Sequence, residues 1–173
     1  PCTAVSAFAP PMNTQSFNLN TKVVEARFTD YEAGMAAAKA EGKPVLIDFT
    51  GFGCVNCRKM EAAVWTDPSV AQKLENDYIL ISLYVDDKTK LPQPVEVKDE
   101  NGEIRTLRTV GDRWSYLQSY KFGANTQPFY VAVDSQGSPL NGAYSYDENV
   151  KDYLNFLDKG LENYKKRMNN AAN

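Results

Sequence analysis

The sequence contains no histidine, the side chain that most often serves as a general base or a zinc ligand near neutral pH. Catalysis by a cysteine–histidine or serine–histidine pair is therefore excluded, as are most catalytic zinc sites. The 173 residues include only three cysteines, too few for a scaffold held together by several disulfides. Long apolar runs are also missing, because none approaches the roughly 18 residues of a membrane-spanning helix.

Basic and acidic residues are nearly balanced in number. Nineteen basic and 22 acidic residues give a net charge of -3, so we expect no nucleic-acid partner. The length and the hydrophobic fraction of 43% suffice for one domain with a core, and no internal repeat is present. Because the sequence begins with Pro1 rather than Met, we expect that an upstream segment, such as a signal peptide or a membrane anchor, precedes it.

The hydrophobic pattern predicts an α/β arrangement. Apolar runs predict strands at 23–28, 44–49, 78–85 and 129–133. Helical spacing or capping residues predict helices at 29–41, from about residue 54, from 66–68, at 111–122 and from about residue 147. Parallel strands come first and a hairpin comes last, so the sheet should be mixed.

Several turn and cap positions are predicted from local signals. Thr29 and Glu32 form a capping-box pattern, and Gly42 suits the left-handed end of that helix. Asn101-Gly102 predicts a hairpin within residues 94–107, and residues 134–137 predict a second one within 129–144.

The run Cys54-Val55-Asn56-Cys57 follows a predicted buried strand and should open a helix. A cysteine at a helix N-terminus faces unpaired N–H groups, which favour the nucleophilic thiolate. Cys57 lies one turn further on the same face, where a Cα separation of roughly 5.5 Å permits a disulfide. We therefore predict that an exposed Cys54 attacks a partner disulfide and a shielded Cys57 resolves the mixed disulfide.

Other interpretations of the cysteine pair stay open from these residues alone. One CXXC is half of a zinc site, but neither a second CXXC nor a histidine completes it. A purely structural disulfide would close a very short loop and stabilise the fold little. A non-enzymatic module that binds a soft metal such as Cu(I) is the third alternative.

Two further positions stand out. Asp48 directly follows the apolar residues 45–47, six positions before Cys54, so its carboxyl should be buried with a raised pKa. It is either a proton acceptor for Cys57 or a strand-end carboxylate that reaches water, and the residues alone favour neither. Pro128 precedes the strand at 129–133, a position that tolerates proline in an ordinary trans bond.

Asp48, the run from Cys54 to Met60 and Gln127-Pro128 together resemble the thioredoxin superfamily. Residues 28–159, and 42–70 most specifically, resemble the C-terminal periplasmic domains of the DsbD family of thiol:disulfide interchange proteins. The resemblance implies a thioredoxin fold: a central mixed β-sheet flanked by helices, with an insertion before a cis-proline. It also implies a cis Gln127-Pro128 bond and a buried acid at Asp48.

The resemblance further implies how such a domain works. Cys54, Cys57 and Asp48 would be catalytic, and Phe52, Gly53, Gln127 and Pro128 would bind the substrate, with the main chain of Gln127 pairing with the partner. The Cys54–Cys57 disulfide would be the only redox group, with no metal and no other cofactor.

The implied partners are a membrane-embedded electron-donating domain upstream and other thioredoxin-like or disulfide-containing extracytoplasmic proteins. The chain would then be a disulfide reductase and electron relay that is periplasmic or otherwise extracytoplasmic, for example as a soluble domain of an inner-membrane protein. A thioredoxin-like oxidase or isomerase is the alternative enzyme.

Residues 1–20 are rich in Pro, Ser, Asn and Thr, which predicts an N-terminal linker or arm. A thioredoxin-like domain at 21–168 and a frayed tail at 169–173 should follow. The domain departs from the family pattern at three places. Phe52-Gly53 stands where a tryptophan usually precedes the first cysteine, and Ser82 replaces a frequent lysine, which should make Asp48 harder to ionise. Residues 88–126 are longer than usual and should contain an inserted hairpin and a short helix. Cys2 lies in the arm, and we expect it to take no part in catalysis.

Overall fold

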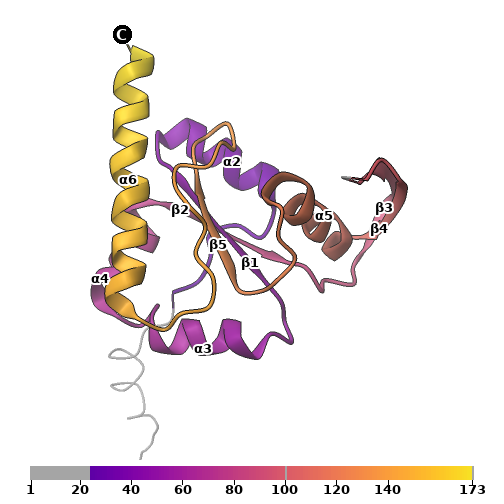
Figure 1. Ribbon diagram of the computed structural model, residues 1–173, viewed down its shortest axis with the longest axis horizontal. Coiled ribbons are helices and arrows are strands. Elements are labelled where there is room, and N and C mark those ends of the chain that lie inside the picture. The colour runs from indigo at the N-terminus through magenta and orange to yellow at the C-terminus, as the bar shows by residue number, and fades with distance from the viewer. Residues whose placement is uncertain (1–23, 100, 173) are drawn as a thin grey trace, which may run out of the picture.

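A three-stranded sheet lies at the centre of the molecule (Figure 1). The computed structural model describes residues 24–99 and 101–172. In the sheet, β1 (Val45–Thr50) lies between β2 (Ile79–Tyr84) and β5 (Phe129–Val133). β1 pairs with β2 in parallel and with β5 in antiparallel orientation, so the predicted mixed sheet is confirmed.

Helices cover both faces of this sheet. The helices α3 (Val55–Ala63), α4 (Pro68–Gln72) and α6 (Val150–Ala172) share one apolar core with the sheet, together with the short π-helix η1 (Lys73–Asp77). The helices α2 (Tyr31–Glu41) and α5 (Val110–Phe122) share a second core on the opposite face. The sheet is therefore the middle of three layers.

The alternation of side chains along β1 places Asp48. Leu46 belongs to the core under α3 and α6, whereas Ile47 and Phe49 belong to the core under α2 and α5. Successive strand residues point to opposite faces, so Asp48 shares the face of Leu46. The carboxyl thus lies on the side of the sheet that α3 covers, and α3 carries the cysteine pair.

The start of α2 differs from the prediction. Its N-cap is Asp30, whose carboxylate accepts a hydrogen bond from the Ala33 N–H at 2.9 Å, so Thr29 is not the cap. Glu32 does not return to the N-cap, because it forms an ion pair with Arg113 of α5 at 3.2 Å. The helix ends at Gly42 in the left-handed conformation, as predicted.

The predicted strand at 23–28 is also reduced in the described part of the chain. Phe28 makes one isolated parallel bridge with Ile81, at the outer edge of β2.

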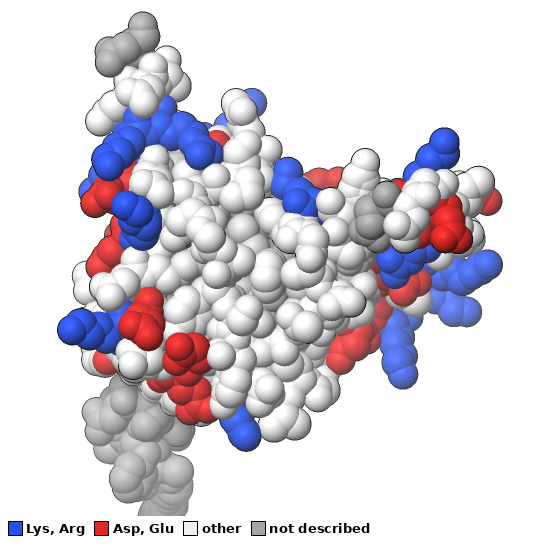
Figure 2. Space-filling model, in the orientation of Figure 1, with Lys and Arg blue, Asp and Glu red and all other residues white. Residues whose placement is uncertain are grey.

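The predicted hairpin around Asn101-Gly102 is present. β3 (Lys90–Lys98) and β4 (Ile104–Thr109) form a separate two-stranded sheet and lead into α5. On the face drawn in Figure 2, charged side chains of both signs gather at this hairpin and along α6, and few lie between them.

The second predicted hairpin forms only in part. Tyr144 and Pro139 make isolated bridges to β5, but residues 140–144 are not a strand. Main-chain hydrogen bonds still join Leu140 to Ala132 and Tyr144 to Tyr130. Side chains add to them: Asn163 donates to the Leu140 carbonyl, and Asn141 donates to the Phe156 carbonyl. Partial sheet pairing and contacts with α6 therefore hold this segment together.

The C-terminal helix differs from the prediction at both of its ends. α6 begins at Val150, three residues later than predicted, and continues to Ala172, so residues 169–172 are helical where we expected a frayed tail. The predicted arm at 1–20 and Cys2 lie outside the described residues.

The N-terminus of α5 is joined closely to the loop that follows β2. The N–H groups of Val110 and Gly111 donate to the carbonyls of Thr89 and Asp87, each at 2.8 Å. A Cβ at Gly111 would lie 2.5 Å from the Val85 carbonyl oxygen and 2.7 Å from that of Asp87. Only a residue without a side chain allows this approach.

We predict that Gly111→Ala destabilises the fold by roughly 1–3 kcal/mol, because backbone atoms must move to admit the methyl group. Thermal unfolding should show a Tm lower by roughly 3–10 °C. Gly142→Ala is the matched control, since a Cβ there would meet no atom within 4 Å. Equal Tm values for the two variants would contradict the close packing of α5 on this loop.

Candidate active site

Cys54 lies at the N-terminus of α3, as predicted. It is the N-cap residue with extended backbone angles, and its Sγ accepts a hydrogen bond from the Cys57 N–H at 3.1 Å. Helix α3 starts here because Gly51, Phe52 and Gly53 form a turn after β1, in which the Cys54 N–H donates to the Gly51 carbonyl. The sulfur therefore faces the unpaired N–H groups of the first helical turn.

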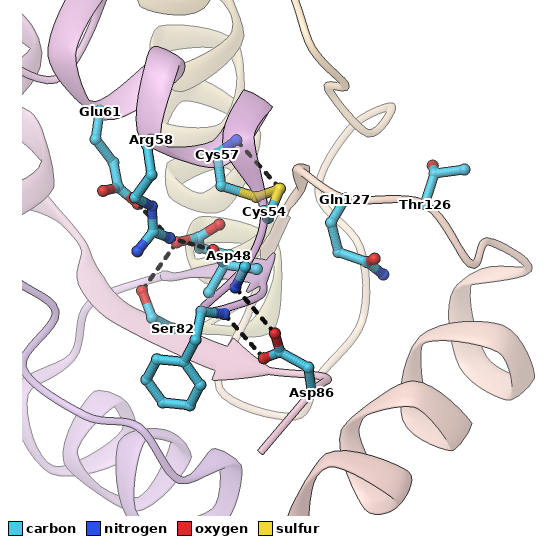
Figure 3. The surroundings of a disulfide bond; sticks show 12 residues. Asp48, Cys54, Cys57, Arg58, Glu61, Ser82, Asp86, Thr126 and Gln127 are labelled. Atoms are coloured by element: carbon cyan, nitrogen blue, oxygen red, sulfur yellow. Dashed lines mark hydrogen bonds and ion pairs between the residues drawn. A yellow bond between two sulfur atoms is a disulfide. The ribbon is translucent and has the colours of Figure 1, made fainter. Parts of the chain in front are cut away.

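Cys54 and Cys57 are joined by a disulfide, with a Cα separation of 5.3 Å (Figure 3). Cys57 is only 1% exposed, whereas Cys54 is partly exposed. This asymmetry matches the prediction that one sulfur is accessible and the other shielded. A partner can reach the pair through Cys54 first.

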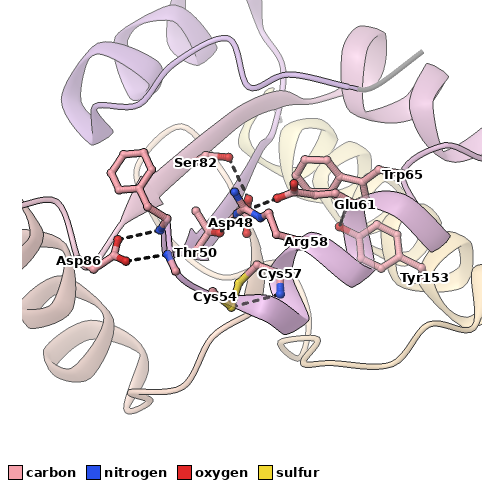
Figure 4. A network of polar contacts seen from close by, with 12 residues as sticks. Asp48, Thr50, Cys54, Cys57, Arg58, Glu61, Trp65, Ser82, Asp86 and Tyr153 are labelled. Atoms are coloured by element: carbon pink, nitrogen blue, oxygen red, sulfur yellow. Dashed lines mark hydrogen bonds and ion pairs between the residues drawn. A yellow bond between two sulfur atoms is a disulfide. The ribbon is translucent and has the colours of Figure 1, made fainter. Parts of the chain in front are cut away.

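Asp48 is 1% exposed, which confirms that its carboxyl is buried. Ser82 Oγ donates to Oδ2 at 2.9 Å, while Oδ1 has no hydrogen-bond partner among the described residues. Burial raises the pKa of Asp48 to about 7, although the Ser82 hydrogen bond works in the opposite direction. Figures 3 and 4 both show the carboxyl between Ser82 and the cysteine pair.

A charged pair on α3 adjoins this carboxyl (Figure 4). Arg58 forms an ion pair with Glu61 at 3.1 Å and donates to Thr50 Oγ1 at 2.9 Å. Burial raises the pKa of Glu61, and Arg58 opposes this effect. Glu61 in turn raises the pKa of Asp48 while Arg58 lowers it, so the two charges partly cancel at the buried acid.

The loop before Cys54 is fixed from the end of β2. The Asp86 carboxylate accepts hydrogen bonds from the N–H groups of Phe52 at 2.8 Å and Gly53 at 3.1 Å (Figure 3). Partial burial opposes ionisation, but these bonds outweigh it and the pKa of Asp86 is lowered. The Phe52 ring is 62% exposed and stacks on Tyr84 with 4.1 Å between ring centroids. Phe52 thus offers an exposed apolar surface beside the disulfide.

The Gln127-Pro128 peptide bond is cis, as the resemblance implied. Figure 3 shows Thr126 and Gln127 across the disulfide from Arg58 and Glu61. The structure therefore brings Asp48, the cysteine pair, the Phe52-Gly53 loop and the Gln127-Pro128 segment to one end of the sheet. Their roles in binding remain predictions.

Sequence reasoning missed Arg58, Glu61 and Asp86 as neighbours of this site, and also Gln118, whose side chain bonds to Thr126 and Gln127. Glu61 had a local signal, because it lies four residues after Cys57 and shares its helix face. Asp86 had a topological signal, since β1 and β2 are parallel and both end at the same edge of the sheet. Gln118 had no signal of either kind.

Comparison with known proteins agrees with this geometry. A family model described as thioredoxin-like matches residues 26–135, well over half of the chain. The chain belongs to the thioredoxin-like family. The predicted fold class is therefore established, and thiol–disulfide oxidoreductase chemistry at the Cys54–Cys57 pair is supported.

Relatives of this thioredoxin-like chain include thiol:disulfide interchange proteins named DsbD. The protein from Salmonella typhimurium is 35% identical over 74 residues, which is 43% of this chain and 12% of that protein. The protein from Yersinia pestis is 24% identical over 147 residues, which is 81% of this chain and 21% of that protein. The chain thus spans a small part of the length of these relatives.

Solved structures agree on the fold. The reduced C-terminal domain of DsbD from Neisseria meningitidis superimposes with a TM-score of 0.54 at 18% identity, covering 77% of this chain and 98% of that domain. An oxidoreductase named DsbH superimposes with the same TM-score of 0.54 at 17% identity, covering 81% of this chain and 87% of its own.

Within residues 24–99 and 101–172, no helix combines the length and the apolar character needed to cross a bilayer. Over the same part of the chain, no three His, Cys, Asp or Glu side chains are grouped so that they could hold a metal ion.

The buried acid predicts a distinct pH dependence of stability. An Asp carboxyl in the unfolded chain has a pKa near 4, so from about pH 4 to pH 7 the unfolded chain loses a proton that folded Asp48 keeps. Folding stability should therefore decline with rising pH across this window by up to about 4 kcal/mol, and this contribution should be constant above it.

We predict that Asp48→Asn removes this decline, because the amide does not titrate. Chemical denaturation of the disulfide form at several pH values between 4 and 8 measures the effect. Asp77→Asn removes an exposed carboxylate and should keep the wild-type profile. Parallel profiles for wild type and Asp48→Asn would show that Asp48 does not titrate in this range.

Proposed function

We propose that this domain is an extracytoplasmic disulfide reductase that relays electrons between other proteins. The observation that carries the proposal is the Cys54–Cys57 disulfide, in which an accessible sulfur is paired with a shielded one above a buried carboxyl. This arrangement suits a two-step exchange with one partner, because the accessible thiol must react first and the shielded one second.

The exchange begins with the reduced dithiol. The Cys54 thiolate attacks one sulfur of the partner disulfide, which forms an intermolecular disulfide and releases the other partner sulfur as a thiolate. Cys57 then loses its proton and attacks Cys54 Sγ, which closes the Cys54–Cys57 disulfide and releases the second partner thiolate. Protonation of the two released sulfurs completes the transfer of two electrons and two protons.

Asp48 is the group placed to accept the Cys57 proton. Its pKa of about 7 means that near neutral pH it both takes up and returns a proton readily. It lies on the sheet face that α3 covers, and among the described residues Ser82 alone donates a hydrogen bond to it. Asp48 thus serves as base when Cys57 attacks and as acid when a donor reduces the disulfide again.

The proposed direction is reduction of the partner. Val55 and Asn56 place no charge between the cysteines, and the domain has no histidine that would stabilise a thiolate there. Electrons would come from a cysteine pair in a membrane-embedded domain and pass to other extracytoplasmic thioredoxin-like domains, by analogy with relatives named as thiol:disulfide interchange proteins.

We predict that Cys57→Ser traps the intermediate, because the mixed disulfide on Cys54 then has no resolving thiol. Incubation with an oxidised CXXC-containing protein should give a covalent adduct, seen by non-reducing electrophoresis and mass spectrometry and released by dithiothreitol.

Cys54→Ser is the matched control and should form no adduct, because Cys57 is shielded. Absence of the Cys57→Ser adduct, together with retention of Cu(I) by the wild type after desalting, would support a metal-binding module instead.

The direction of transfer predicts a reduction potential near that of thioredoxin, about -270 mV, rather than the about -120 mV of a strong oxidase. Equilibration of the domain with glutathione or dithiothreitol redox buffers measures it. A value above about -180 mV would place the domain among isomerases and oxidases and would rule out the reductase.

A further inference from the structure

Gln118 is a buried amide that the mechanism above does not use. It lies in α5, on the opposite sheet face from the cysteine-bearing helix, and its side chain is 0% exposed. A glutamine amide carries both donors and an acceptor, and burial without partners is costly. Its partners therefore show what the side chain is for.

Both ends of the Gln118 amide bond to the segment that precedes Pro128. Gln118 Nε2 donates to the Thr126 carbonyl oxygen at 2.8 Å, and Gln118 Oε1 accepts from Gln127 Nε2 at 2.9 Å. One side chain thus holds the main chain of one residue and the side chain of the next.

The bond to Thr126 fixes the orientation of the Gln127 N–H. A peptide unit is planar, and in the trans form its C=O and N–H point in opposite directions. The Thr126–Gln127 bond is not cis, so a Thr126 carbonyl directed at α5 turns the Gln127 N–H away from α5. This N–H is left as a donor for an incoming extended peptide, which binds through main-chain hydrogen bonds.

The second bond acts on the Gln127 side chain. Figure 3 shows that side chain directed away from the cysteine pair, and its Nε2 is bonded to Gln118. The space over the disulfide is therefore not occupied by the Gln127 amide. A partner sulfur needs that space to reach Cys54.

Main-chain hydrogen bonds fix both ends of α5, the helix that carries Gln118. The first N–H groups of the helix bond to the loop after β2, and the Gly123 N–H caps its C-terminus on the carbonyls of Gln118 and Ser119. The Ala124 N–H also donates to the Gln118 carbonyl, at 3.4 Å. The helix main chain from which the Gln118 side chain extends is thus bonded to its surroundings at both ends.

We propose that Gln118 is a positioning residue that orients the Gln127 main chain for polypeptide substrates. The inference rests on the proposed function and adds that the domain distinguishes protein disulfides from small ones. A small disulfide has no main chain to pair with Gln127, so it gains nothing from this orientation.

The test compares how fast the same pre-reduced protein reduces a protein disulfide and a small disulfide. Single-turnover rate constants are measured by stopped flow with insulin and with bis(2-hydroxyethyl) disulfide, and their ratio is taken for each variant. Gln118→Met removes both hydrogen bonds at similar volume, and the ratio of insulin rate to small-disulfide rate should fall roughly three- to tenfold. Both rates are measured at a temperature at which circular dichroism shows each variant to be folded, because an unfolded chain exposes thiols that reduce the small disulfide and lower the ratio on their own.

Two further variants separate the causes. Gln127→Ala removes the side-chain bond but keeps the Gln118 bond to Thr126, so its ratio should fall less than that of Gln118→Met. Ser119 is the neighbouring residue in α5, and its hydroxyl donates to the Tyr116 carbonyl rather than to the segment before Pro128. Ser119→Ala should therefore keep the wild-type ratio.

The outcomes distinguish this inference from the proposed function. If the wild type reduces both disulfides but the ratio is unchanged in Gln118→Met, the positioning role of Gln118 is contradicted while the proposed function stands. The same holds if the ratio falls equally in Gln118→Met and Gln127→Ala. A wild type that reduces neither disulfide contradicts the proposed function and this inference with it.

Discussion

The burial of one carboxyl, that of Asp48, is the constraint on which the site depends. A carboxylate inside an apolar core is unfavourable, and a single hydrogen bond from Ser82 compensates only in part. The group therefore keeps its proton up to about pH 7, where an exposed Asp would have lost it. The carboxyl is buried because β1 is the central strand, and this central position also brings Asp48 under α3.

The remaining groups of the site are arranged around the ends of the same strands. β1 ends two residues before Phe52, and β2 ends two residues before Asp86, which bonds to the Phe52-Gly53 loop. The loop after β2 in turn holds the start of α5, and α5 holds the segment before Pro128 through Gln118. Side chains from distant parts of the sequence thus share one rigid support, which suits a site that must hold two sulfurs and a partner in register.

The sequence predicted those parts of the site that have local causes. The cysteine pair follows from spacing and a helix start, and the burial of Asp48 follows from the apolar run before it. The hydrogen bonds of Asp86 and Gln118 join residues far apart in the sequence, so no local pattern contains them. The prediction of Thr29 as N-cap was wrong, because Asp30 beside it is a more favourable cap, and Glu32 pairs with Arg113 instead.

The electrostatics around the disulfide bear on the direction of electron flow. A strong oxidase stabilises its reduced form as a thiolate, which makes its disulfide easy to reduce. Here Glu61, and above about pH 7 also Asp48, can place negative charge beside the cysteine pair (Figure 4), and negative charge disfavours a second anion nearby. Arg58 offsets this effect only in part, because its positive charge also forms an ion pair with Glu61. A disfavoured thiolate makes the disulfide the more stable state, and a domain that prefers its disulfide gives electrons to its partners, which supports the proposed reductase.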